Sequence, residues 1–182
     1  MSGTVCWGFH DQVTMPADRI AAPRASWRFL TALFEKHEIP ATWAVVGHLC
    51  LDGCDGTHAD HPCEEAWFSR DPGGVMTADS RWFAPRLVTN IRDSAVGHDI
   101  GLHAFSHVEF GAKATTPAIA DAELHHGVTA VDRLGITPVS FVFPRNNVGH
   151  RSLLAARGFT CYRGLRPDRW YDTSPVPGVE TL

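Results

Sequence analysis

Two histidines four residues apart, His103 and His107, are the side chains of this sequence best suited to hold a metal ion. This spacing would place both imidazoles on the same side of one helical turn. Two neutral histidines need a third protein ligand, usually a carboxylate. Asp11 offers one just after a β-prone run at residues 4–9. Two histidines and one carboxylate suit Zn²⁺ or another borderline divalent ion.

A metal held by three protein groups keeps a position for water and substrate. It would polarise a carbonyl oxygen and lower the pKa of water toward ~7, so the set predicts hydrolysis of an amide or ester without a covalent intermediate. His10 stands beside Asp11 and is the candidate general base. Adjacent strand residues point to opposite faces, so both residues reach one site only if the strand has ended and the chain is turning.

The elements that would position these residues alternate between strand and helix. Strands are predicted at residues 4–9, 41–46, 99–103, 139–143 and 159–162. Helices are predicted at residues 23–37, 84–91, 117–135 and 151–157. Such alternation indicates a parallel sheet covered by helices. The candidate ligands follow strand C-termini, which is the edge where α/β proteins build their sites.

The 182 residues fit one domain with a single core. Residues 50–80 lose hydrophobic periodicity and are rich in Cys, His, Asp, Gly and Pro, which predicts an irregular insertion. Its cysteines and histidines leave two interpretations open, a second, structural zinc or reduced cysteines in a loop. The residues in question are Cys50, Cys54, His58, His61 and Cys63.

Composition argues against several classes of protein. A net charge of −4 offers no basic field for nucleic acid. No stretch approaches the length of a membrane span, and the N-terminus does not have the pattern of a secretory leader. Five scattered cysteines are not a disulfide framework and favour a reducing compartment. We therefore expect a cytoplasmic protein with no nucleic-acid or membrane partner.

Three strand ends together resemble the motifs of the polysaccharide deacetylase family, the NodB-like carbohydrate esterases. Residues 101–107, Gly-Leu-His-Ala-Phe-Ser-His, are similar to the family's metal-binding H-[ST]-x-x-H motif. Residues 8–11, Gly-Phe-His-Asp, stand where the family has T-F-D-D. Residues 141–144, Phe-Val-Phe-Pro, resemble the third motif. The order and spacing of the three motifs match over residues 4–162, and three agreeing motifs are more specific than any one.

The resemblance implies an α/β fold, a distorted (β/α) barrel of the polysaccharide deacetylase type, built as one domain over residues 1–182. It implies metal-dependent removal of acetyl groups from a carbohydrate, which for an N-acetyl group is hydrolysis of a non-peptide carbon-nitrogen bond. Asp11, His103 and His107 match the family's metal ligands. The third motif forms a substrate groove wall, which implies substrate contacts for Pro144, Arg145 and Asn146.

The chain departs from the family at several positions. His10 stands where the family has its catalytic-base aspartate, and Ala104 replaces a hydroxyl residue. The family's bracing arginine precedes the third-motif proline, whereas Arg145 follows Pro144 here. The later motifs, including the general-acid histidine, have no clear match. We therefore expect a barrel that is incomplete at its C-terminus, with self-association through the open edge.

Two alternatives to the hydrolase remain. The first is a catalytically weakened relative that binds carbohydrate, with Trp43, Trp67 and Trp82 either stacking on sugars or packing in the core. The second is an amide hydrolase that acts on a small substrate. His150, after the fourth predicted strand, is either a replacement general acid or a surface histidine.

Overall fold

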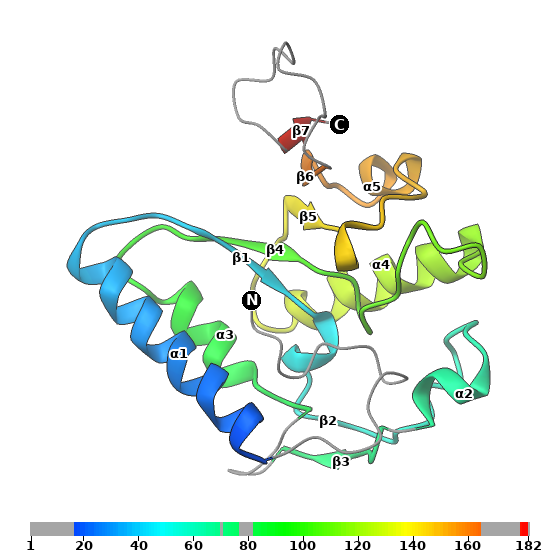
Figure 1. The fold of residues 1–182 in the computed structure, drawn as a ribbon, viewed down its shortest axis with the longest axis horizontal. Helices are drawn as coiled ribbons and strands as arrows, with labels where there is room; N and C mark the ends of the chain where they lie inside the picture. Colours follow the sequence, from blue (N-terminus) through cyan, green and yellow to red (C-terminus); the bar gives the residue numbers. More distant parts are fainter. Residues whose placement is uncertain (1–16, 70, 77–81, 165–178, 182) are drawn as a thin grey trace.

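The central element of the protein is a five-stranded sheet. The computed structural model describes residues 17–69, 71–76, 82–164 and 179–181. The sheet order is β1 (Thr42–Val45), β4 (Asp99–Leu102), β5 (Ser140–Val142), β6 (Cys161–Arg163) and β7 (Val179–Thr181). The first four strands run parallel, and β7 is antiparallel to β6 (Figure 1). The fold is therefore mixed α/β with a four-stranded parallel sheet, while the strand predicted at 4–9 lies outside these ranges.

The helices alternate with these strands, as the sequence predicts. They are α1 (Ala17–Lys36), α3 (Pro85–Arg92), α4 (Pro117–Asp132) and α5 (Ser152–Ala156). The first helix begins at Ala17 rather than at Pro23, because the alanine-containing run before the proline favours helix. The helices α1 and α3 pack against each other, and α4 packs against α5 (Figure 1). No helix in the ranges above combines the length and the apolar character that a membrane span needs.

Trp43 of β1 lies in the hydrophobic core. Its indole meets the ring of Trp27 with centroids 5.5 Å apart and that of Phe34 at 5.9 Å, both edge to face. Such contacts add to the gain from burying apolar surface. With 8% of its surface exposed, Trp43 is a core residue and is not available to stack on a sugar.

Two close backbone approaches position the C-terminal edge of the sheet. A Cβ atom on Gly101 of β4 would collide with the Ser140 side chain of β5. A Cβ atom on Gly47 would lie 2.7 Å from the Cα of Gly127 in α4. Gly47 opens a short 3₁₀ helix, η1 (Gly47–Cys50), that directly follows β1. Glycine at these positions lets β5 lie close to β4 and lets α4 lie close to the start of η1.

The irregular region predicted at 50–80 contains only short elements. These are β2 (Gly53–Cys54), α2 (Glu65–Phe68) and β3 (Gly74–Val75), with β2 and β3 paired antiparallel. They lie below the sheet in the view of Figure 1, away from β6 and β7.

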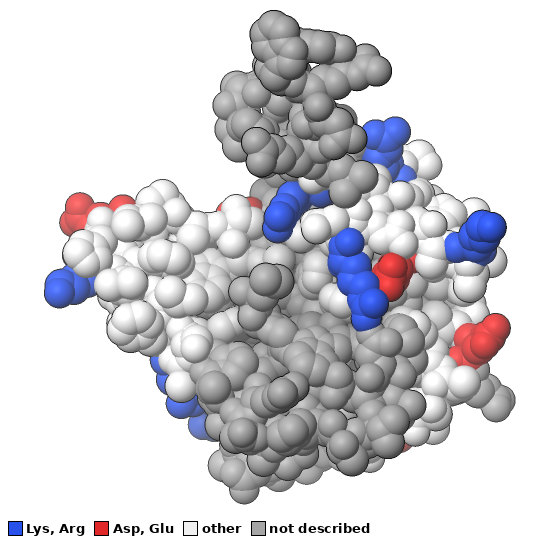
Figure 2. Space-filling model, viewed as in Figure 1, with Lys and Arg blue, Asp and Glu red and all other residues white. Residues whose placement is uncertain are grey.

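Charged side chains lie singly or in small opposite-sign groups on the face drawn in Figure 2. On that face, the described residues form no broad field of one sign.

Candidate metal centres

His103 follows β4 and is held by a hydrogen bond from its ring. Its Nδ1 lies 2.6 Å from the carbonyl oxygen of Val142 at the end of β5. A carbonyl oxygen can only accept, so Nδ1 carries the proton and Nε2 keeps a lone pair. Burial lowers the pKa of His103 despite the opposite effect of the Val142 hydrogen bond. The ring of His107 is 4.9 Å away between centroids, so the two imidazoles are neighbours at this edge of the sheet.

The helical turn predicted for this pair is wrong. Residues 103–107 form an irregular segment in which Ala104 has φ 61° and His107 has φ 70°. Left-handed backbone is uncommon for residues other than glycine and persists where the surroundings impose it. The loop, and not helical periodicity, brings the two rings together.

A buried carboxylate from α4 holds this loop. Glu123 is 0% exposed and accepts hydrogen bonds from the backbone N–H groups of Phe105 at 2.9 Å and Ser106 at 2.8 Å. The Ser106 hydroxyl also donates to Glu123 and in turn accepts from Trp67 Nε1 at 2.8 Å. His61 Nε2 lies 3.1 Å from Glu123, although not with the geometry of a hydrogen bond. The indole N–H of Trp67 is therefore part of this hydrogen-bond network.

The opposite side of the loop is hydrogen-bonded to η1. The N–H of Gly47 donates to the carbonyl of Ala104, and the N–H of His48 donates to the carbonyl of Phe105, both at 2.9 Å. The loop that carries His103 and His107 is thus fixed between η1 and α4.

The third motif lies at the same sheet edge, because β4 and β5 are parallel neighbours. Its proline begins a short kinked segment, η2 (Pro144–Asn146), in which φ is 52° at Arg145 and 55° at Asn146, outside the range of a regular helix. Glu109 joins the two loops, with Oε1 3.4 Å from Arg145 Nε and Oε2 accepting from Asn147 Nδ2 at 2.9 Å. Pro144 is buried, whereas Arg145 and Asn146 are exposed.

The predicted catalytic residues His10 and Asp11 lie outside the described residues, so their place beside His103 and His107 stays a prediction. His150 donates from Nε2 to the carbonyl of Thr115 at 2.8 Å. A role as general acid would have to use its other ring nitrogen or break this bond.

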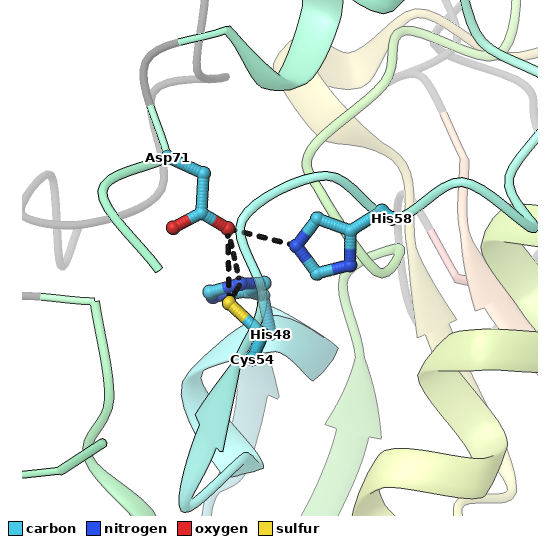
Figure 3. A group of neighbouring side chains, drawn as sticks. All are labelled: His48, Cys54, His58 and Asp71. Carbon is cyan, nitrogen blue, oxygen red and sulfur yellow. Dashed lines mark hydrogen bonds and ion pairs between the residues drawn. The ribbon is translucent and has the colours of Figure 1, made fainter. Parts of the chain in front are cut away.

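A second group of ligand atoms lies in the cysteine-rich region (Figure 3). One ligand atom each from His48, Cys54, His58 and Asp71 lies within 4.8 Å of every other, and the group could hold a metal ion. Asp71 Oδ2 is 2.9 Å from His48 Nε2, 2.8 Å from His58 Nε2 and 3.3 Å from Cys54 Sγ. The four side chains come from η1, β2, the loop after β2 and the segment before β3.

The sequence predicts only part of this group. Cys54 and His58 belong to it, whereas Cys50 is buried in the hydrophobic core and His61 lies beside Glu123. Cys63 packs against the same core. The cysteine spacing alone could not identify His48, although a histidine directly after a predicted strand is a signal of a site.

Local turns aim the ligands at one another. Asp55 Oδ1 accepts from the N–H of Thr57 at 2.8 Å and of His58 at 3.2 Å, which forms an Asx turn that positions His58. The N–H of Gly73, at φ 62°, donates to Asp71 Oδ1 at 3.0 Å and so fixes the carboxylate.

The charges of this group depend on its buried carboxylate. Burial raises the pKa of Asp71, but hydrogen bonds from His48 and His58 lower it more, so it lies well below its usual range. Burial and the charge of Asp71 raise the pKa of the Cys54 thiol to about 12. A reactive cysteine needs a lowered pKa, so Cys54 is not set up as a nucleophile.

Comparison of the chain with models of known protein families and with curated proteins finds no match.

Proposed function

We propose that the protein is a metal-dependent hydrolase of the polysaccharide deacetylase type that removes acetyl groups from a carbohydrate. The observation that carries the proposal is the His103 hydrogen bond to Val142, which leaves a lone pair on Nε2 of a ring whose centroid is 4.9 Å from that of His107. Metal-bound histidines usually have this kind of support from a carbonyl behind the ring.

In this proposal Asp11, His103 and His107 hold a divalent ion, Zn²⁺ in particular, at the C-terminal edge of the sheet. The ion would supply Lewis-acid chemistry, polarising an acyl carbonyl and making water more acidic. His10 takes up the proton of the attacking water. Arg145 and Asn146 are exposed next to the site and would contact polar groups of the sugar.

The proposal extends to the fold and the location. The four parallel strands would form part of a distorted (β/α) barrel. We also propose that the protein acts in the cytoplasm.

Matched variants test the roles of the residues. His107→Ala should lose the ion of this centre and all acetate release from an acetylated oligosaccharide. His10→Ala should keep the ion but lose about 10²–10⁴-fold in turnover, the usual contribution of a general base. His37→Ala, at an exposed histidine beyond α1, is the control and should change neither.

Metal content by elemental analysis and acetate release are measured on the same samples. Equal loss of metal in His107→Ala and His10→Ala would make His10 a ligand instead of the base. A metal-loaded wild type that binds the glycan but releases no acetate would replace the proposal with the carbohydrate-binding alternative. Release from small amides alone would replace it with the other hydrolase.

A further inference from the structure

The group formed by His48, Cys54, His58 and Asp71 is separate from the hydrolase ligands and has a different composition (Figure 3). We propose that these four side chains bind a structural Zn²⁺ ion that fixes the irregular region onto the end of the sheet. The inference does not depend on the proposed hydrolase activity.

The donor set fits zinc. Two imidazole nitrogens, one thiolate and one carboxylate are all common zinc ligands, and four protein ligands close the coordination shell as structural sites do. With ordinary Zn–N, Zn–O and Zn–S bonds, tetrahedral ligand atoms lie ~3.3–3.6 Å apart. Cys54 Sγ already lies 3.5 Å from His48 Nε2 and 3.3 Å from Asp71 Oδ2. The two nitrogen-oxygen distances of 2.9 and 2.8 Å would open by about half an ångström to reach the same spacing.

The hydrogen bonds within the group compete for one acceptor atom, and a bound cation would remove this competition. Three potential donors, from His48, His58 and Cys54, converge on the single oxygen Oδ2 of Asp71. A carboxylate oxygen offers about two lone-pair sites, so three donors exceed what it accepts well. One divalent ion in place of these protons satisfies all four ligand atoms at once.

The histidine at the centre of the group has the support that zinc ligands show. His48 is 2% exposed, and its Nδ1 lies 3.3 Å from the carbonyl oxygen of Trp82, which can only accept. When Nδ1 carries the proton that Trp82 accepts, Nε2 and Asp71 Oδ2 are 2.9 Å apart, and either a second ring proton or a cation must lie between them. A bound zinc ion fills that place with the usual arrangement, a carbonyl behind the ligating imidazole.

A nucleophilic cysteine is the competing explanation, and the geometry argues against it. A catalytic triad uses both ring nitrogens, one toward the nucleophile and the other toward the carboxylate. Here the same atom, Nε2 of His48, is close to both Cys54 Sγ and Asp71 Oδ2. The imidazole therefore cannot relay a proton from the thiol to a second partner.

Few regular elements hold the local fold. The strands β2 and β3 have two residues each and α2 has four, which is too little secondary structure to be stable by itself. Where a region has few stable elements, the free energy of metal binding becomes free energy of folding. An ion bound by η1, β2 and the two loops would connect the whole region to the sheet.

Cobalt substitution of the full chain tests the site. Co²⁺ bound to a thiolate gives a charge-transfer absorption band in the near ultraviolet, and the hydrolase centre contains no sulfur. Wild type and His107→Ala should both show this band. Cys54→Ala should lose it together with one equivalent of metal, whereas Cys63→Ala, a partly buried cysteine of the same region outside the group, should keep both.

The proposal is overturned if wild type lacks the band, or if Cys54→Ala retains it. Should Cys54→Ala fail to fold, X-ray absorption at the zinc edge of the wild type decides, with one sulfur neighbour expected at ~2.3 Å. A zinc environment without sulfur would reject the site. Chelation should also open residues 51–76 to proteolysis while the sheet stays protected, and cleavage that does not depend on the chelator would reject the structural role.

Discussion

Glutamate is usually a surface residue, but the buried side chain of Glu123 holds the loop at 103–107. This ionisable residue of α4 is fully buried, and its carboxylate accepts hydrogen bonds from backbone N–H groups of that loop. A buried carboxylate is tolerated where several hydrogen bonds replace its water. The loop that carries both histidines of the proposed hydrolase centre therefore depends on a carboxylate supplied by another element, α4.

Removing this carboxylate should be costly. Glu123→Ala leaves the N–H groups of Phe105 and Ser106 buried without their acceptor, and each such loss costs about 1–3 kcal/mol. We expect the free energy of unfolding to fall by about 3 kcal/mol, measured by urea denaturation. Glu123→Gln should lose less, because one amide oxygen can still accept from both N–H groups.

Asp132→Ala is the control, since Asp132 is exposed at the end of the same helix. Its effect should stay within about 0.5 kcal/mol, as for ordinary surface substitutions. A loss below about 1 kcal/mol in Glu123→Ala would mean that the loop is held by η1 alone.

At the level of elements, the sequence predicts the regular parts well. Strands β1, β4, β5 and β6 and helices α1, α3, α4 and α5 all coincide with predicted segments, because each has a clear hydrophobic period or apolar run. The antiparallel strand β7 was not predicted. This strand has only three residues and follows a proline-rich stretch of sequence, so it shows no hydrophobic periodicity. Its pairing with β6 is set by tertiary contact.

The sites were predictable only in part. The pair His103 and His107 was visible from its spacing, but its loop conformation depends on hydrogen bonds from distant segments. The side chains of His48 and Asp71 are 23 residues apart in the sequence and meet through the folding of an irregular region. No local pattern encodes that contact, so the sequence left a second zinc and reduced cysteines as alternatives and did not give the full group of four.

The contact between α4 and the end of α5 should weaken in acid. Arg157 donates to both carboxylate oxygens of Asp121, at 2.9 and 2.6 Å, and this pair lowers the pKa of Asp121. Because the folded-state pKa lies below the unfolded value of about 3.9, the stabilisation is present above pH ~4 and is lost as the pH falls through the folded-state pKa. Asp121→Asn should therefore lower stability at pH 7 and have no effect in stronger acid.

The effect should be small, about 0.2–1 kcal/mol, because the pair is partly exposed and screened by solvent. Urea midpoints of wild type and Asp121→Asn, measured across pH, give the difference directly. It should also shrink with added salt. A difference that persists in acid strong enough to protonate Asp121 would show that the loss comes from packing.

At the scale of the whole molecule, the sheet has an edge at β1. Within the described ranges β1 pairs with β4 alone, and Thr42 on this strand is exposed. An unpaired edge presents backbone groups to which another chain can add.

We expect concentration-dependent self-association through this edge, detected by sedimentation velocity. Thr42→Lys should weaken it, because a charge on an edge strand opposes pairing. Asn90→Lys makes the same change of charge at an exposed position of α3 and should leave association unchanged. A wild type that sediments as a monomer at every concentration would indicate that the edge is covered.

The two backbone hydrogen bonds between η1 and the loop at 103–107 join the two proposed centres. His48 belongs to one centre, and the loop it contacts carries both histidines of the other. An ion that orders η1 would reduce the entropy lost when the loop takes up its own ion. Such an influence is reciprocal, since each ion raises the affinity for the other by the same factor. If both centres bind, the chain loads its metals cooperatively and passes from empty to doubly loaded over a narrow range of free zinc.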